Sequence, residues 1–128
     1  MYEKILVGTD GSATAAQAVR KAIELARISD AALDIVTVRG TDQSEESAKQ
    51  LLEPATAEAR DAGLQAVNGL VRGGDPSEAL VSAAEQRGSD LLVVGNKGMT
   101  GTKRFLLGSV PDKISHHAPC AVLIVQTS

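Results

Sequence analysis

Short runs of consecutive apolar residues alternate along this chain with longer segments in which apolar residues recur every three or four positions. The short runs are typical of buried strands and cover residues 4–8, 33–38, 65–71, 91–94 and 121–126. Near-continuous hydrophobicity of this kind is typical of parallel strands that are covered on both faces. The helical periodicity marks residues 13–28, about 42–62, 75–87 and about 109–117. The alternation predicts an α/β fold, a five-stranded parallel sheet with helices on both faces.

Polar residues and glycines at the ends of these segments predict where the helices begin and end. Three residues are expected as N-caps: Ser12, Asp42 and Asp75. Glu45 follows Asp42 by three residues, which is the pattern of a capping box. Pro54 lies inside the second helical segment, where it costs about 3 kcal/mol, so that helix either begins late or bends there. Gly63 and Gly88 are expected to end the second and third helices.

Length and composition narrow the class of protein. The 128 residues suit a single domain, 1–128, and 43% of them are hydrophobic, which is enough for a core. Only 2% are aromatic and the net charge is −3, which argues against a nucleic-acid partner. No apolar run approaches the ~18 residues of a membrane span, and the run after Lys4 is too short for a signal peptide. One cysteine, Cys120, fits a reducing compartment, so we expect a cytoplasmic protein without a membrane partner.

A glycine-rich segment follows the fourth predicted strand. Gly95 ends that strand, Gly98 and Gly108 follow, and Ser109 stands at the start of the last predicted helix, in the spacing G-x2-G-x9-G-S. Glycines let the backbone approach a ligand closely, and a helix N-terminus presents unpaired N–H groups, so the combination favours anion binding. A purely structural strand-to-helix connection is the alternative. The two common phosphate-loop patterns, G-x-x-x-x-G-K-[ST] and G-x-G-x-x-G after a strand, are both missing from the sequence.

Together with three other motifs, this spacing resembles the universal stress protein family. The motifs are the opening K-I-L-V-G-T-D-G-S at 4–12, G-G-D-P at 73–76, and H-A-P-C at 117–120 followed by an apolar strand. The resemblance covers residues 2–125, and within the family the G-x2-G-x9-G-S spacing marks members that resemble ATP binders. It implies a Rossmann-like sheet of strand order 3-2-1-4-5, as in adenine nucleotide alpha hydrolase-like folds.

In open α/β sheets, ligands bind beyond the carboxyl ends of the strands where the strand order reverses, here between the first and fourth strands. The resemblance implies adenine contacts at Gly8, Thr9, Asp10 and Val38. It implies phosphate and ribose contacts at Gly95, Gly98, Gly108, Ser109 and Val110, with Val94 beneath the base. Between the first two glycines, Asn96 and Lys97 depart from the hydroxyl residue and Arg or His that members often carry. Lys97 keeps a positive charge near the phosphates, and Lys103 and Arg104 are further candidates or else solvated loop charges.

Asp10 is the expected contact for a metal ion. A carboxylate beside phosphate-binding amides repels phosphate unless a cation such as Mg²⁺ bridges the two. The alternative is an aspartate that only forms the turn before Gly11. His116 and His117 are adjacent on a helix and point about 100° apart, so we expect them to be structural. Cys120 precedes the last strand, at the end of the sheet away from the site, and is expected to be a buried, inert thiol.

The resemblance therefore implies an ATP-binding protein of stress response or signalling, and the carboxylate of Asp10 adds Mg²⁺ as the expected accompanying ion. No Ser-His-Asp or Cys-His set converges on the expected site, so catalysis is not the first expectation. The resemblance also implies a homodimer formed by edge pairing of the last strand, through Val122, Leu123, Ile124 and Val125. Three alternatives stay open: a cyclic AMP-binding module of the same fold, a slow ATPase or phosphotransferase, and a dimeric interaction protein that binds no nucleotide.

Overall fold

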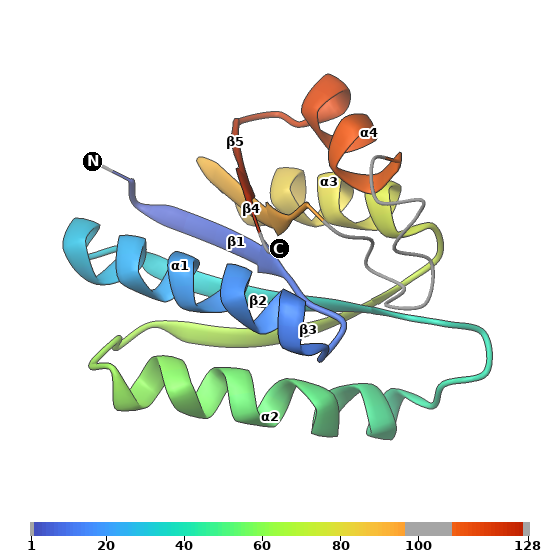
Figure 1. Ribbon diagram of the computed structural model, residues 1–128, viewed down its shortest axis with the longest axis horizontal. Helices are drawn as coiled ribbons and strands as arrows, with labels where there is room; N and C mark the ends of the chain where they lie inside the picture. The colour runs from blue at the N-terminus through green and yellow to red at the C-terminus, as the bar shows by residue number, and fades with distance from the viewer. Residues whose placement is uncertain (1, 97–108, 127–128) are drawn as a thin grey trace.

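The computed structural model describes residues 2–96 and 109–126 (Figure 1). The elements follow one another as β1 (Lys4–Gly8), α1 (Ala13–Ser29), β2 (Ala32–Arg39), α2 (Glu45–Asp61), β3 (Val67–Gly73), α3 (Pro76–Arg87), β4 (Leu91–Gly95), α4 (Ser109–His117) and β5 (Ala121–Val125). All strand pairings are parallel, and the sheet order is β3-β2-β1-β4-β5. The predicted fold class and strand order are confirmed.

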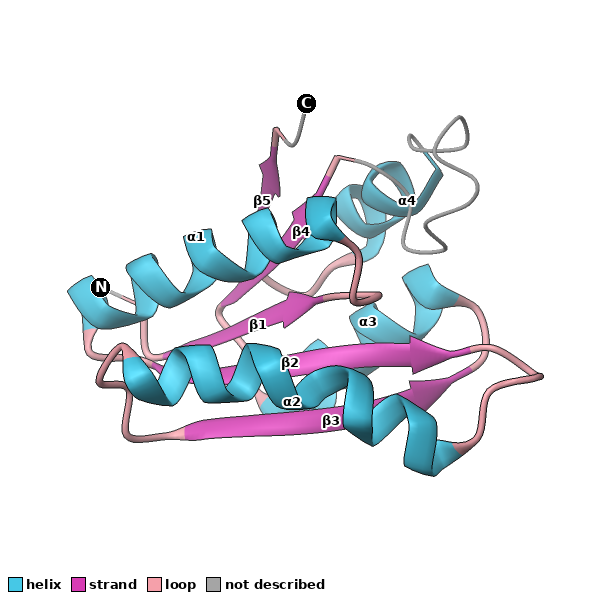
Figure 2. Ribbon diagram, turned by 60° about the horizontal axis from the view of Figure 1, so that its bottom comes forward, coloured by secondary structure: helices cyan, strands magenta, loops and turns pink. Residues whose placement is uncertain are grey.

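Helices cover both faces of the sheet, and Figure 2 shows α1 and α2 together on one side of it. Alternate residues of each strand supply the two cores. On the α1/α2 side, Ile5 and Val7 of β1 pack with buried residues of those helices. On the other side, Leu6 packs with Leu80 of α3 and Ile114 of α4. The three β1 side chains, Ile5, Leu6 and Val7, are each 1% exposed or less. The continuous apolar strands predicted from sequence are therefore buried on both faces.

The helix ends agree with the predictions except at the start of α2. Ser44, not Asp42, caps that helix: its Oγ accepts a hydrogen bond from the Ser47 N–H at 3.0 Å. The helix then runs through Pro54, which is exposed, to Asp61. At α3, the Asp75 carboxylate accepts the Glu78 N–H at 3.1 Å, as its sequence pattern predicts. Among the described helices, none has both the length and the hydrophobicity that crossing a bilayer requires.

Candidate functional site

The carboxyl ends of β1 and β4 lie beside each other, at the point where the strand order reverses. The two strands pair in register from Ile5↔Leu91 to Val7↔Val93. Gly8 and Gly95 therefore end neighbouring strands, side by side at the carboxyl ends of the sheet strands. The strand ends therefore bring the predicted residues Gly8–Asp10 and Val94–Asn96 to one region, which is where the general rule for α/β sheets places a ligand.

The turn after β1 is held by local hydrogen bonds. Thr9, 3% exposed, donates its N–H to the Val36 carbonyl at 2.9 Å, and its Oγ1 accepts the Gly11 N–H at 3.1 Å. Asp10 Oδ1 accepts the Ser12 N–H at 2.9 Å, and the Ser12 hydroxyl caps α1 by accepting the Ala15 N–H at 3.1 Å. This turn fixes the Asp10 side chain before any ligand arrives.

Asp10 uses only one of its two carboxylate oxygens in this turn. Oδ2 is buried and has no hydrogen-bond partner among the described residues. A buried carboxylate oxygen without a donor is costly, and native proteins rarely leave one unpaired. The turn-forming role and the ligand-binding role considered for Asp10 are thus compatible, because each uses a different oxygen.

A cavity of about 420 Å³ lies at the carboxyl ends of the strands. The residues that line it come from the loops after β1, β2 and β3, the end of β2, α2 and the start of α3: Asp10, Thr37, Val38, Arg39, Gly40, Gln43, Leu51, Gly74 and Pro76. Its volume falls in the range of small-molecule sites, roughly 300–1,000 Å³. The charged residues in this lining are Asp10 and Arg39, on an otherwise neutral wall. The predicted contacts Asp10 and Val38 therefore share one cavity.

Gly11 lies where the Asp10 turn packs against α2. Its φ of +83° is a conformation that residues with a side chain rarely adopt. A Cβ at this position would lie 2.9 Å from Leu51 Cγ, and Leu51 also lines the cavity. The glycine therefore lets the turn approach α2 closely, and it sets the position of one cavity wall relative to Asp10.

The predicted contacts on the β4 side are described only in part. Val94 is 1% exposed and packs in the core on the α3/α4 side, and the Asn96 N–H donates to the Val125 carbonyl at 2.9 Å. Ser109 begins α4, and half-buried Val110 packs against the same core. The remaining predicted contacts lie outside the described residues: Lys97, Gly98 and Gly108, with Lys103 and Arg104.

No group of three or more His, Cys, Asp or Glu side chains that could hold a metal occurs in the described part of the chain. Mg²⁺ in nucleotide sites is commonly held by one or two carboxylates and by phosphate oxygens. The unpaired Oδ2 of Asp10 fits that arrangement as a single protein ligand. A metal at Asp10 would therefore depend on the nucleotide for its other ligands.

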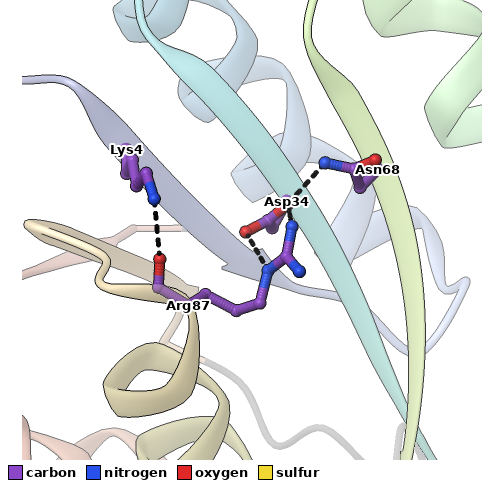
Figure 3. A network of polar contacts seen from close by, with 4 residues as sticks. All are labelled: Lys4, Asp34, Asn68 and Arg87. Carbon is purple, nitrogen blue, oxygen red and sulfur yellow. Dashed lines mark hydrogen bonds and ion pairs between the residues drawn. The ribbon is translucent and has the colours of Figure 1, made fainter.

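A second polar cluster, which the sequence did not predict, lies toward the amino ends of β1, β2 and β3 (Figure 3). Asp34 of β2, 6% exposed, accepts hydrogen bonds from Arg87 Nε at 3.0 Å and Arg87 Nη2 at 3.2 Å. Asn68 Nδ2 donates to the same carboxylate at 3.2 Å, and Lys4 Nζ donates to the Arg87 carbonyl at 3.3 Å. The hydrogen bonds and the negative charge of Asp34 raise the pKa of Arg87. Both Asp34 oxygens have donors, so this cluster is structural.

The histidines and the cysteine lie away from the candidate site. His116 and His117 are exposed in the last turn of α4, where His116 Nε2 lies 3.6 Å from Asp112 Oδ1. Cys120 is half-buried, less than expected, just before β5, whose first residue pairs with Leu91 at the amino end of β4. Burial and the nearby charge of Asp90 raise the pKa of the Cys120 thiol, which favours the unreactive protonated form.

Comparison with known proteins identifies relatives over the whole chain. A model of the universal stress protein family matches residues 1–126. A putative universal stress protein of Staphylococcus epidermidis is 33% identical, over 98% of this chain and 85% of its own length. The sequence-based resemblance is confirmed.

Solved structures with the same fold include proteins with bound nucleotides. A universal stress protein in complex with cAMP is 37% identical, with a TM-score of 0.84 over 99% of this chain and 98% of its own. The universal stress protein of Archaeoglobus fulgidus in complex with dAMP is 27% identical, with a TM-score of 0.74 over 97% of this chain and 98% of its own.

Proposed function

The chain belongs to the universal stress protein family, and from that premise we propose that it binds an adenine nucleotide at the carboxyl ends of β1, β2 and β4. The observation that carries the proposal is the unpaired Oδ2 of Asp10, a residue that lines a cavity of about 420 Å³. Two relatives of the same fold, 37% and 27% identical, are solved in complex with cAMP and dAMP, which supports an adenine nucleotide as the ligand.

The cavity would hold the base and the glycine-rich segment would hold the phosphates. Adenine presents an exocyclic amino group that donates hydrogen bonds and ring nitrogens that accept them. Val38, Leu51 and Pro76 supply apolar surface for the ring, and Asp10 supplies an acceptor. The proposed phosphate and ribose contacts are Gly95, Asn96, Lys97, Gly98, Gly108, Ser109 and Val110. Gly8 and Thr9 are proposed adenine contacts, and Val94 is proposed to lie beneath the base.

ATP is the nucleotide that the G-x2-G-x9-G-S spacing favours, with the physiological role of a stress or energy-state signal. In this form of the proposal, Asp10 Oδ2 binds Mg²⁺, and the ion bridges to the phosphates. The matched protein that contains cAMP favours a second candidate, because a cyclic nucleotide has one phosphate and needs no bridging metal. In that case Asp10 Oδ2 accepts a hydrogen bond from the adenine amino group instead.

Calorimetric titration of the full chain tests both candidates, with ATP, ATP plus Mg²⁺ and cyclic AMP as the probes. Binding of ATP that strengthens with Mg²⁺ and falls by about tenfold or more in Asp10→Asn supports the ATP form, because charged hydrogen bonds contribute ~1.5–3 kcal/mol. Tighter binding of cyclic AMP, independent of Mg²⁺, supports the second candidate. No binding of either probe contradicts the proposal and leaves a nucleotide-free interaction protein. Release of ADP on incubation would add a slow ATPase activity.

We also propose that two copies pair through β5, in the cytoplasm that the single cysteine suggests. β5 lies at the edge of the sheet, and its Ile124 is 42% exposed. The opposite edge is protected, because Arg60 Nη2 and Arg72 Nη1 donate to the β3 carbonyls of Val67 and Val71 at 3.4 Å and 3.1 Å. The Ala66 carbonyl accepts a hydrogen bond from Leu33 of β2. Successive carbonyls of a strand point to opposite sides, so the Val67 and Val71 carbonyls face away from β2.

Light scattering after size-exclusion chromatography tests the pairing. Ile124→Lys should convert a dimer to a monomer, because a charge on the paired edge is costly to bury. Ile28→Lys is the matched control: Ile28 is 70% exposed on α1, so its replacement should leave the dimer intact. A wild-type protein that runs as a monomer, or an Ile124 variant that stays dimeric, contradicts pairing through β5.

A further inference from the structure

Arg39 stands out among the residues that line the candidate cavity. It is the last residue of β2, directly after Val38, and both residues line the cavity. The lining contains no aromatic side chain, as far as the described residues show. Tyr2 packs against the α1/α2 core, and it precedes β1 at the opposite end of that strand. The guanidinium of Arg39 is therefore the planar cation available in this lining.

The Arg39 side chain is held in place by the turn that follows it. Nη1 donates to the Gln43 carbonyl at 2.7 Å, and the turn is closed by the Gln43 N–H, which donates to the Gly40 carbonyl at 3.2 Å. Within residues 2–96 and 109–126, Arg39 forms no ion pair with a carboxylate. One hydrogen bond to a neutral carbonyl leaves the remaining N–H groups and the flat face of the guanidinium available.

We infer that the Arg39 guanidinium stacks on the base of the nucleotide bound in this cavity and gives the site a preference for purines. The inference rests on the proposed function. A guanidinium plane stacks on aromatic rings and on nucleobases in the way that an aromatic side chain does, and a lysine ammonium lacks that plane. The larger ring system of a purine offers more surface to the guanidinium than a pyrimidine does. In both forms of the proposed function, Arg39 covers the face of the base.

Three proteins test the inference: wild type, Arg39→Ala and Arg39→Lys. Each is titrated with ATP and with cyclic AMP, and with their cytosine counterparts CTP and cyclic CMP. Arg39→Ala should weaken binding of the adenine nucleotides by about fivefold to tenfold, at the low end of what removal of a stacking partner costs. Arg39→Lys should lose most of the same affinity, although it keeps the positive charge and a donor for the Gln43 carbonyl. In both variants, the ratio of adenine to cytosine affinity should fall.

Arg20 offers a matched control. It is an exposed arginine of α1, with its Nε 3.4 Å from Glu58 Oε2, and it does not line the cavity. Arg20→Ala should leave nucleotide affinity unchanged. Thermal unfolding without nucleotide should show the same midpoint for Arg39→Lys and wild type, which separates loss of stacking from loss of folding.

The outcomes distinguish this inference from the proposed function. If wild type binds none of the nucleotides, the proposed function fails and the inference fails with it. If wild type binds but both Arg39 variants bind as tightly, only the inference is overturned. Full affinity in Arg39→Lys with a loss in Arg39→Ala overturns stacking as well, because charge or the bond to Gln43 then accounts for the effect. An unchanged adenine-to-cytosine ratio in the variants overturns the purine preference.

Discussion

Two aspartates of this molecule have opposite surroundings. Asp34 lies near the amino end of β2, and its two carboxylate oxygens receive hydrogen bonds from Arg87 and Asn68. Asp10 lies beyond the end of β1, where one oxygen caps the local turn and the other is buried without a partner among the described residues. Asp34 is buried and Asp10 is half-buried with a buried Oδ2, yet only Asp34 is given all of its donors by the fold.

This difference separates a carboxylate whose donors are all supplied by the fold from one whose hydrogen bonding is incomplete. Burial of a charged oxygen is tolerated when donors compensate for the lost water, which is the situation at Asp34. At Asp10 the compensation is incomplete, and the residue lines a cavity. Removing the Asp34 carboxylate should therefore affect folding, whereas removing the Asp10 charge should affect binding. The following variants test that division, from the largest expected effect to the smallest.

Asp34→Ala should lower the free energy of unfolding by about 2–3 kcal/mol, because it leaves Arg87 and Asn68 without their acceptor. The loss is below the ~3–5 kcal/mol of a fully buried pair, since the Arg87 side chain is 38% exposed. Urea denaturation measures it, and the double variant with Arg87→Ala isolates the pairwise contribution. Nucleotide affinity should stay at the wild-type value. A stable Asp34→Ala protein with reduced affinity would reverse the assignment.

Gly11→Ala should destabilise the fold by about 2 kcal/mol and also weaken nucleotide binding. The positive φ costs roughly 1–2 kcal/mol for a residue with a side chain, and the new Cβ would meet Leu51 of the cavity wall. Gly63→Ala is the matched control, because its φ is +101° but no atom lies within 4 Å of the added Cβ. The control should share the strain and keep full affinity. Equal affinity in both variants would show that Leu51 does not position the site.

Asp75 is a third carboxylate, exposed at the surface and satisfied by its own turn. Hydrogen bonds from the Ser77 hydroxyl and then from the Glu78 N–H lower its pKa below the ordinary value of 3.8. Asp75→Ala should cost about 1 kcal/mol of stability at neutral pH, the usual value of an N-cap. Because the folded-state pKa is depressed, this contribution is present above pH 3.8 and is lost as the pH falls through the lower folded value.

Urea denaturation at a series of pH values measures the Asp75 effect. The difference between wild type and Asp75→Ala should shrink as the pH falls below 3.8. Asp75→Asn keeps an oxygen for the Glu78 N–H but cannot titrate in this range, so its stability relative to Asp75→Ala should be independent of pH. A pH-independent difference between wild type and Asp75→Ala would contradict the role of the charged form.

Asp10→Asn should have the smallest effect on stability, below about 0.5 kcal/mol, since an amide oxygen can still accept the Ser12 N–H. The substitution also removes a charge whose buried Oδ2 has no donor among the described residues, so a slight gain in stability is also consistent with the comparison. Chemical denaturation of Asp10→Asn beside Asp34→Asn measures the contrast directly. Equal destabilisation by the two substitutions would show that Asp10 is structural in the same sense as Asp34.

Several features of the fold were predictable because they depend on local sequence. The strands are continuous apolar runs, and α3 is bounded by Asp75-Pro76 and Gly88, whose left-handed φ of +69° suits glycine. The start of α2 was predicted wrongly at Asp42. The chain uses residues 40–43 in a turn closed by the Gly40 carbonyl and braced by Arg39, so the next polar residue, Ser44, becomes the cap. Local signals allowed either residue as a cap.

The glycine-ended strands and the strand order implied by the family resemblance predict a ligand near Asp10 and Val38, and the structure brings both residues to the lining of one cavity. The rest of that lining was not predicted. Arg39 and Leu51 were not predicted as lining residues, because nothing in the sequence brings the end of β2 and the middle of α2 to the Asp10 turn. The Asp34–Arg87 pair was also missed, since its members stand in a strand and at a helix end 53 residues apart.

By itself, the sequence determined the order and type of the elements. It also predicted that a ligand binds at the carboxyl ends of the strands. These follow from hydrophobic periodicity, capping residues and glycines, which act within a few neighbouring residues. Only the tertiary structure decided which aspartate is satisfied and which is not. That outcome depends on donors that arrive from distant segments: Arg87 and Asn68 reach Asp34, and no described side chain reaches Asp10 Oδ2.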